Sequence, residues 1–371
     1  MGEGRGGGAR RIVAASTILI GLLLALPVTH PANAVDLVSP FDITARRELR
    51  GSPLGAFACP AVPRAVRDLK FDGYYADRGA GSSVIDRRAY EIYREATEAI
   101  GRFENGVTRI TDQYVASKPA DPRPAACALD WLTAWARAGA MLGEATPQGG
   151  FVRKWGLAPV AASYLKLRDE PSLDGAGKAE VETWIARWAR VVREDYDSPR
   201  LESRRNNHLY WAAWSVGLAA VTLDDRALLD WSLAKARLGL AQVKPDGTLP
   251  LEMARKGRAY HYHVFAAAPL VMTAELAARN GGDLYGELDG ALDRLVARVL
   301  AGFDDDSFFA AASGQTQDRS GSSKEPHFAW LEAYYARTAN GRAAPLIAKL
   351  RPVRDRRLGG DMTLLFGADL R

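Results

Sequence analysis

In CALDWLTAWARAGAML, which runs from Cys127 to Leu142, the large apolar residues recur with the period of an α-helix. AEVETWIARWARVVRE, residues 179–194, repeats this pattern with tryptophan, isoleucine and valine. The same spacing returns in RALLDWSLAKARLGLAQV, APLVMTAELAARN and LDGALDRLVARVLAGF, whereas the alternation typical of strands is almost absent. Turn-forming runs such as EATPQGG and KPDGTLP separate these segments. The sequence therefore predicts an all-α protein.

The arrangement of these helices is suggested by their connections. Short turns join them, so neighbours along the chain are expected to form antiparallel pairs. The absence of a seven-residue seam and of a strict repeat argues against a coiled coil and favours a ring or toroid of helices. No Gly/Ser-rich linker or block of charge divides residues 35–371, so we expect a single domain there.

The first residues of the chain predict export. Arg5, Arg10 and Arg11 precede the apolar run IVAASTILIGLLLALPV, and the small residues Ala32 and Ala34 follow it. This is the layout of a secretory signal peptide, so residues 1–34 are expected to be removed by a cut near Ala34–Val35. The general export route is favoured over a twin-arginine route, for which only ARRIV argues. No later segment is long and apolar enough to predict a membrane span in the mature chain.

Charge and cysteine content set further bounds. The chain carries 49 Lys and Arg against 44 Asp and Glu, and it stays mildly basic without the signal peptide. This balance suits a polyanionic partner, although a plain solvated surface explains it equally well. Cys59 and Cys127 are the two cysteines, and an even pair in an oxidising compartment favours one disulfide. Their spacing carries no metal-site signature.

The aromatic residues point to a core and to a binding groove. Most of the nine tryptophans lie at helical spacing and are expected in the core. Trp155 in RKWGL and Trp211 in NNHLYW lie beside polar or cationic residues near predicted helix starts. Because aromatic faces stack on sugar rings, these two are our candidates for the wall of a carbohydrate groove.

NNHLYWAAWSV, residues 206–216, places two amides and an imidazole at the start of an apolar helix. Either Asn206 or Asn207 can cap the helix, but capping explains neither the second asparagine nor His208. A second cluster, in LEMARKGRAYHYHV, brings cationic, phenolic and imidazole groups together: Arg255, Lys256, Arg258, Tyr260, His261, Tyr262 and His263.

Three interpretations compete for these groups. His208, His261 and His263 could bind zinc, but no matching acidic or cysteine ligand pattern accompanies them. The cluster could also be a plain basic surface. The third interpretation is chemistry on an acidic sugar, in which an amide, an imidazole and a guanidinium offset the charge of a uronate carboxylate while the C5 proton is removed. A tyrosine beside arginine and histidine could have its pKa lowered enough to move that proton and to protonate the departing O4.

The motifs NNHLYWAAWSV, CALDWLTAWARAGAMLGE and LPLEMARKGRAYHYH together resemble the alginate lyases of polysaccharide lyase family five. These are periplasmic enzymes that cleave polymannuronate by β-elimination. The resemblance runs from about Cys59 to Gly360 and includes RKWGLAPVAASYLKL, FAWLEAYYA and RLGGD. The separations between His208, Arg255 and Tyr262 agree with those of the family's histidine, arginine and tyrosine, which selects Tyr262 over Tyr260 and Arg255 over Arg258.

The resemblance implies an incomplete (α/α) toroid with a deep groove, a disulfide between Cys59 and Cys127, and neither metal nor other cofactor. Asn207, His208 and Arg255 would neutralise the carboxylate. Tyr262 would be the acid and, on mannuronate, the base, while His208 could be the base for a sugar of opposite C5 configuration. A mobile lid is implied within LKFDGYYADRGAGSS, and Arg357 would contact a carboxylate further along the groove. The implied contacts in that lid segment are Lys70, Tyr74 and Tyr75.

Departures from the family pattern bear on specificity. Val264 and Phe265 stand where the family has two polar residues, and Leu209 replaces a small polar one. We therefore predict a periplasmic, endolytic lyase for poly-β-D-mannuronate, with polyglucuronate or a broader range of polyuronates as the alternative. A different class remains open, namely a non-catalytic polyuronate-binding component of an exopolysaccharide export complex. Nucleic acid is not an expected partner.

Overall fold

The computed structural model describes residues 1–2, 37–77, 82–197, 204–319 and 325–370. Contacts divide the chain into Met1–Asp36 and Leu37–Arg371, and every described helix and strand lies in the second unit. The expected signal peptide, residues 1–34, falls outside the described residues except for Met1 and Gly2. The export signal and the domain boundaries remain predictions.

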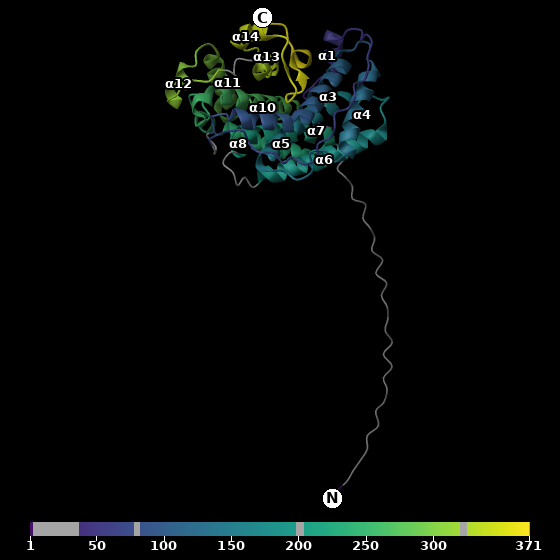
Figure 1. Ribbon diagram of the computed structural model, residues 1–371. Helices are drawn as coiled ribbons and strands as arrows, with labels where there is room; N and C mark the ends of the chain where they lie inside the picture. The colour runs from purple at the N-terminus through teal and green to yellow at the C-terminus, as the bar shows by residue number, and fades with distance from the viewer. Residues whose placement is uncertain (3–36, 78–81, 198–203, 320–324, 371) are drawn as a thin grey trace. The chain divides into compact units, whose positions relative to one another are not determined.

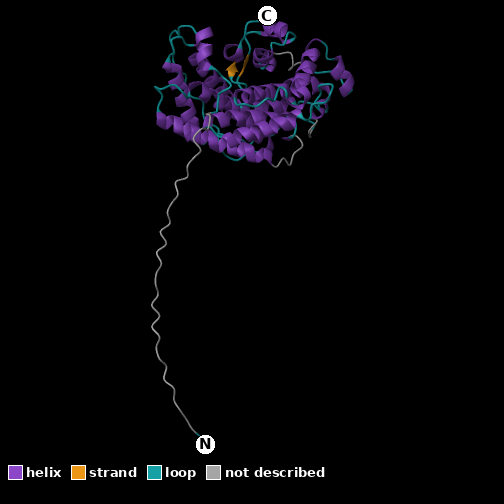
Figure 2. Cartoon of the chain, turned by 180° about the vertical axis from the view of Figure 1, so that it is seen from behind, coloured by secondary structure: helices purple, strands orange, loops and turns teal. Residues whose placement is uncertain are grey.

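The all-α prediction is confirmed, and Figure 2 shows helices almost throughout. An inner row of long helices forms the centre of the unit, each helix contacting the next along the row. These are α3 (Glu98–Ala116), α5 (Pro147–Leu167), α7 (Asn207–Leu223) and α10 (Ala259–Arg279).

An outer row covers the inner one, with successive outer helices packed between inner ones (Figure 1). It consists of α4 (Pro122–Arg137), α6 (Gly175–Asp197), α8 (Arg226–Leu240) and α11 (Glu287–Asp304). Each outer helix packs against an inner helix, as α4 does against α3 and α8 against α7. This double layer is the (α/α) arrangement that the resemblance implies.

The double layer of long helices does not close on itself, so the toroid is incomplete. Shorter helices connect its last inner helix, α10, to its first, α3. From α10 the contacts pass to α13, then to α15, then to α1, and α1 lies against α3. The shorter helices are α1 (Ile43–Arg50), α2 (Arg87–Ala96), α9 (Pro250–Met253), α12 (Ser307–Ser313), α13 (Leu331–Thr338), α14 (Ala343–Leu350) and α15 (Met362–Phe366), with the 3₁₀ turns η2 (Lys256–Arg258) and η3 (Glu325–Phe328). The two described strands, β1 (Arg354–Asp355) and β2 (Gly360–Asp361), pair as an antiparallel hairpin.

The sequence explains which helices are central. Helix α7 is apolar on all its faces and nearly every residue is buried, as expected of a helix surrounded by others. Gly217 lets α7 pack closely against α8 and α10, because a Cβ there would meet Ser232 Oγ and Leu276 Cδ2 at 2.6 Å. Asp224 ends the helix in a left-handed conformation, and Asp225 caps the start of α8. Helix α7 therefore fixes the positions of α8 and α10.

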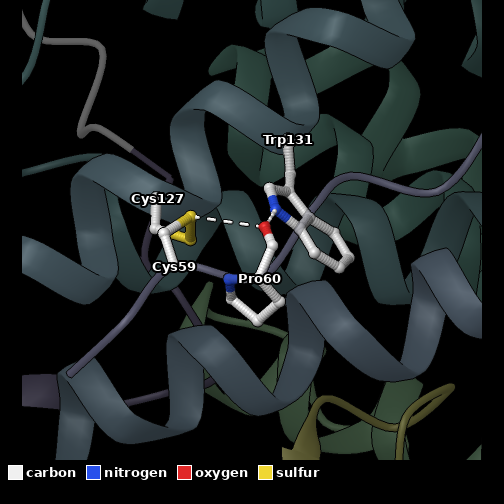
Figure 3. The surroundings of a disulfide bond; sticks show 4 residues. All are labelled: Cys59, Pro60, Cys127 and Trp131. Carbon is white, nitrogen blue, oxygen red and sulfur yellow. Dashed lines mark hydrogen bonds between the residues drawn. A yellow bond between two sulfur atoms is a disulfide. The ribbon is translucent and has the colours of Figure 1, made fainter.

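The predicted disulfide is present (Figure 3). It joins Cys59, in the irregular segment before α2, to Cys127 on α4, with Cα atoms 5.6 Å apart. Trp131, one helical turn after Cys127, donates a hydrogen bond from Nε1 to the Pro60 carbonyl at 3.0 Å. The disulfide and the indole together hold this segment against the outer row. Among the described helices, none has the length and apolar character that a membrane crossing requires.

Candidate active site

A cavity of about 830 Å³ opens at the N-terminal ends of the inner helices. Its wall includes residues from the first turns of α3, α5, α7 and α10, such as Gly101, Gln148, His208 and His261. The N-terminus of a helix carries a partial positive charge and unpaired N–H groups. Arg255, Arg258, Arg356 and Arg357 add guanidinium groups to the same wall, one of which, Arg356, is paired with Glu104. The cavity is therefore suited to an anionic ligand.

Asn206 and Asn207 have different functions at the start of α7. Asn206 is the N-cap, and its side-chain oxygen accepts a hydrogen bond from His208 N at 3.1 Å. Asn207 lines the cavity and bonds to Glu252 of α9 through its backbone N at 2.6 Å and through Nδ2 at 3.0 and 3.1 Å. Burial raises the pKa of Glu252 to about 7, although the bonds from Asn207 lower it. Glu252 therefore fixes the orientation of the Asn207 amide.

His208 lies in the cavity wall between aromatic rings and a lysine. Its ring stacks on Phe151 with centroids 3.9 Å apart, and its Nδ1 is 2.8 Å from Lys154 Nζ. Burial lowers the pKa of His208 well below its ordinary value, and the charges of Lys154 and Arg255 lower it further. The imidazole is therefore neutral near pH 7, and it can offset a carboxylate charge only as a hydrogen-bond donor.

Arg255 and Tyr262 lie in the same cavity wall as Asn207 and His208. The guanidinium carbon of Arg255 lies 3.5 Å from the centroid of the Tyr262 ring, and the Tyr262 hydroxyl is 2.5 Å from that of Tyr75. Burial raises the pKa of the Tyr262 phenol well above its ordinary value, although Arg255 lowers it. The expected lowering of this pKa is therefore wrong for the protein without substrate, in which Tyr262 is a neutral phenol.

The structure brings the predicted quartet Asn207, His208, Arg255 and Tyr262 together in the wall of one cavity. Four of the six residues predicted to bind substrate line the same cavity: Tyr74, Tyr75, Trp155 and Arg357. The guanidinium of Arg357 lies over the Trp155 ring, 4.7 Å from its centroid. Tyr74 packs against Tyr75 with centroids 4.9 Å apart. The glycine-rich part of the predicted lid, residues 78–81, lies outside the described residues.

Two predicted groove residues lie elsewhere. Trp211 is 1% exposed and packs in the core against Phe265, which itself lines the cavity. One turn along α7 from Asn207, the helix has already entered the core, so Trp211 is not a groove residue. Lys70 is also absent from the cavity wall, since its side chain is 59% exposed and pairs with Glu144 at 2.5 Å.

The three histidines considered as zinc ligands do not form a metal site. Both ring nitrogens of His263 bond to backbone atoms, Leu249 N and Ala259 O, each at 2.8 Å. His261 lines the cavity, and its buried Nδ1 has no protein partner among the described residues. Across the described part of the chain, no group of three or more His, Cys, Asp or Glu side chains could hold a metal ion.

Sequence reasoning missed two polar residues that support the site, Lys154 and Glu252. Lys154 lies within RKWGL, directly before Trp155, and it is a charged residue on an otherwise buried face of α5. Glu252 lies just before Arg255 in LEMARK. A charge within an apolar helical stretch was the available signal, but their partners, His208 and Asn207, are far away in sequence.

The double layer of helices carries a cationic cavity that combines amide, imidazole, guanidinium and phenol groups. The alginate lyase family model matches residues 73–309. A polysaccharide lyase of Stenotrophomonas maltophilia is 38% identical over 315 residues, covering 83% of this chain and 90% of the relative. An alginate lyase of Pseudomonas syringae pv. syringae is 37% identical over 317 residues, with coverage of 84% and 83%. The chain belongs to the alginate lyase family.

Solved structures agree with this assignment. Alginate lyase A1-III from Sphingomonas species A1 superimposes with a TM-score of 0.74 at 25% identity, covering 92% of this chain and 100% of the other. A tyrosine-to-phenylalanine variant of alginate lyase A1-III, complexed with tetrasaccharide, superimposes with a TM-score of 0.80 at 25% identity, covering 92% and 99%. The likeness confirms the incomplete (α/α) toroid.

Proposed function

We propose that the protein cleaves poly-β-D-mannuronate, the mannuronate form of alginate, by β-elimination within the polymer. The observation that carries this proposal is the grouping of Tyr262, Arg255, His208 and Asn207 in one cationic cavity. Relatives named alginate lyase, and a related structure complexed with tetrasaccharide, support an anionic polysaccharide as the substrate.

The first step is removal of the C5 proton. His208, Arg255 and Asn207 would hydrogen-bond the uronate carboxylate and stabilise the enolate-like charge that develops on it. The base is the Tyr262 phenolate, whose charge Arg255 would stabilise from its position 3.5 Å from the ring centroid.

The second step breaks the glycosidic bond. The electron pair from the C5–H bond forms the C4–C5 double bond, the C4–O4 bond breaks, and Tyr262 returns the proton to O4. One product then carries an unsaturated 4-deoxy uronate at its non-reducing end. A single residue can act as base and acid when the C5 proton and O4 lie on the same side of the ring.

The pH dependence follows from the neutral state of Tyr262. Because burial raises the pKa of this phenol, the phenolate is a minor species near pH 7. We expect kcat/KM to rise with pH on the alkaline side, since deprotonation supplies the base. A profile that falls steadily from neutral to alkaline pH would contradict Tyr262 as the base.

Export to the periplasm is part of the proposal. The Cys59–Cys127 disulfide supports it, since such bonds persist in oxidising compartments and are rare in the bacterial cytosol. The signal-like arginines and apolar run at the N-terminus point the same way.

The experiment is a panel of purified polymannuronate, polyguluronate and polyglucuronate, followed by the ultraviolet absorbance of the new double bond. We expect the fastest rise with polymannuronate and an early fall in viscosity, which indicates cleavage inside the chain. Faster turnover of polyglucuronate would overturn the mannuronate preference. Binding without product on every polymer would instead indicate a non-catalytic component of an export system.

A further inference from the structure

Lys154 is buried beside the site in an unusual way for a lysine. It lies in the second turn of α5, its side chain is 0% exposed, and no carboxylate among the described residues pairs with it. Lysine is rarely buried completely without an anionic partner. Its closest polar contact is instead the site histidine, with Nζ 2.8 Å from His208 Nδ1.

The surroundings of Nζ determine the direction of this hydrogen bond. Nζ lies 3.8 Å from the centroid of the Trp155 ring and 5.3 Å from that of Phe151. The faces of aromatic rings attract cations and N–H groups but offer no hydrogen to an acceptor. Both ring faces stabilise the ammonium form of Lys154, and an ammonium can only donate, so Nζ is the donor and His208 Nδ1 is the acceptor.

We infer that Lys154 is a positioning residue that holds His208 in the tautomer with its hydrogen on Nε2. A neutral imidazole that accepts at Nδ1 must carry its hydrogen on the other nitrogen. Nε2 has no hydrogen-bond partner among the described residues, and the ring belongs to the cavity wall. Stacking on Phe151 fixes the plane of the ring, so a single N–H is presented to the cavity.

The protonation states are consistent with this arrangement. Burial lowers the pKa of His208, and the Lys154, Arg255, Arg204 and Arg357 charges lower it further, which keeps the imidazole neutral. Burial, followed by the charges of Arg357 and Arg204, also lowers the pKa of Lys154. The direction of the bond rests on the ammonium form of Lys154, which has hydrogens to donate and no lone pair, and the Trp155 ring face 3.8 Å from Nζ stabilises that form.

The consequence for catalysis rests on the proposed function. With its hydrogen on Nε2, His208 can donate to a uronate carboxylate but has no free electron pair at Nε2 with which to take the C5 proton. Lys154 thereby reserves proton removal for Tyr262. It would thus favour sugars whose C5 proton faces Tyr262 over those of opposite C5 configuration.

The tautomer is measured directly by NMR of protein labelled with ¹⁵N in its histidine rings, with the His208 signals assigned by their loss in His208→Ala. We expect an unprotonated Nδ1 and a protonated Nε2 in the wild type near pH 7. In Lys154→Met, which keeps length but removes the donor, we expect both His208 signals to move toward the averages of a tautomer mixture. A protonated Nδ1 in the wild type would overturn the inference, whether or not Lys154→Met folds.

Lys166→Met is the matched control, because Lys166 is a second buried lysine of α5 whose Nζ contacts Asp112 at 2.5 Å, away from the cavity. It should leave the His208 signals unchanged. Unchanged signals in a folded Lys154→Met would contradict the positioning function.

A kinetic measurement separates this inference from the proposed function. On polymannuronate, Lys154→Met should lower kcat by roughly 10- to 100-fold, as when the partner orienting a functional histidine is removed, with little change in KM. If the wild type cleaves no polyuronate, the proposed function fails while the NMR result still decides the tautomer. If Lys154→Met turns over like the wild type, Lys154 does not position His208 for catalysis.

Discussion

Glu252 should make the stability of the protein depend on pH in a defined direction. Burial raises the pKa of this carboxyl from 4.5 to about 7, so the folded protein holds the proton more tightly than the unfolded chain. The stabilisation is fully present below pH 4.5 and is lost as the pH rises through about 7. The difference between these two pKa values corresponds to about 3 kcal/mol of unfolding free energy.

Glu252→Gln tests this, because glutamine has nearly the same shape and keeps an acceptor for Asn207 N–H but does not titrate. Urea unfolding of both proteins, from about pH 4.5 to about pH 8, gives the difference in unfolding free energy. We expect that difference to shift by about 3 kcal/mol in favour of the variant over this range. A difference that is the same at every pH would refute the reasoning.

Three further predictions concern the groove, the tyrosine pair and the disulfide. Trp155→Ala should lower kcat/KM through lost stacking on the sugar, by an amount that corresponds to about 1 to 3 kcal/mol of transition-state binding. Trp211→Phe should lower the melting temperature and leave KM unchanged. An equal change of KM in both variants would contradict the placement of Trp211 in the core. Tyr75→Phe should shift the alkaline rise of kcat/KM to lower pH, since the Tyr75 hydroxyl raises the pKa of Tyr262. An unchanged pH profile would show that the Tyr75 hydroxyl does not affect the Tyr262 pKa. Replacing both cysteines by serine should cost roughly 4 kcal/mol in denaturant unfolding, given the separation of 68 residues, and thiol titration of unfolded, unreduced wild type should find no free thiol.

The helical architecture was predictable because it depends on local information. Stretches such as CALDWLTAWAR in α4 carry the 3.6-residue period, and capping residues such as Asn206 and Asp225 stand where helices begin. The closure of the circuit by α13, α15 and α1 was not predictable, since it depends on contacts between the two ends of the unit. The helices at both ends are short, with 8 residues in α1 and 5 in α15.

The site was predictable where neighbours in sequence are also neighbours in space. The Arg255 to Tyr262 cluster lies within one short segment, whereas Lys154 and Glu252 act through partners 54 and 45 positions away. Proximity in sequence also led to a wrong prediction, the placement of Lys70 in the groove. Lys70 lies in an extended segment between the buried Leu69 and Phe71, so its side chain points to the opposite side, toward solvent.

The most direct test of the central claim is the rate of double-bond formation on polymannuronate by the wild type and by Tyr262→Phe, with binding of the polymer measured on the same samples. The variant lacks one hydroxyl and keeps Arg255, His208 and Asn207 in the cavity wall. We predict a loss of turnover on the order of 10²- to 10⁴-fold with binding nearly unchanged, because proton transfer contributes about that much. Turnover close to that of the wild type would show that Tyr262 does not carry the proton.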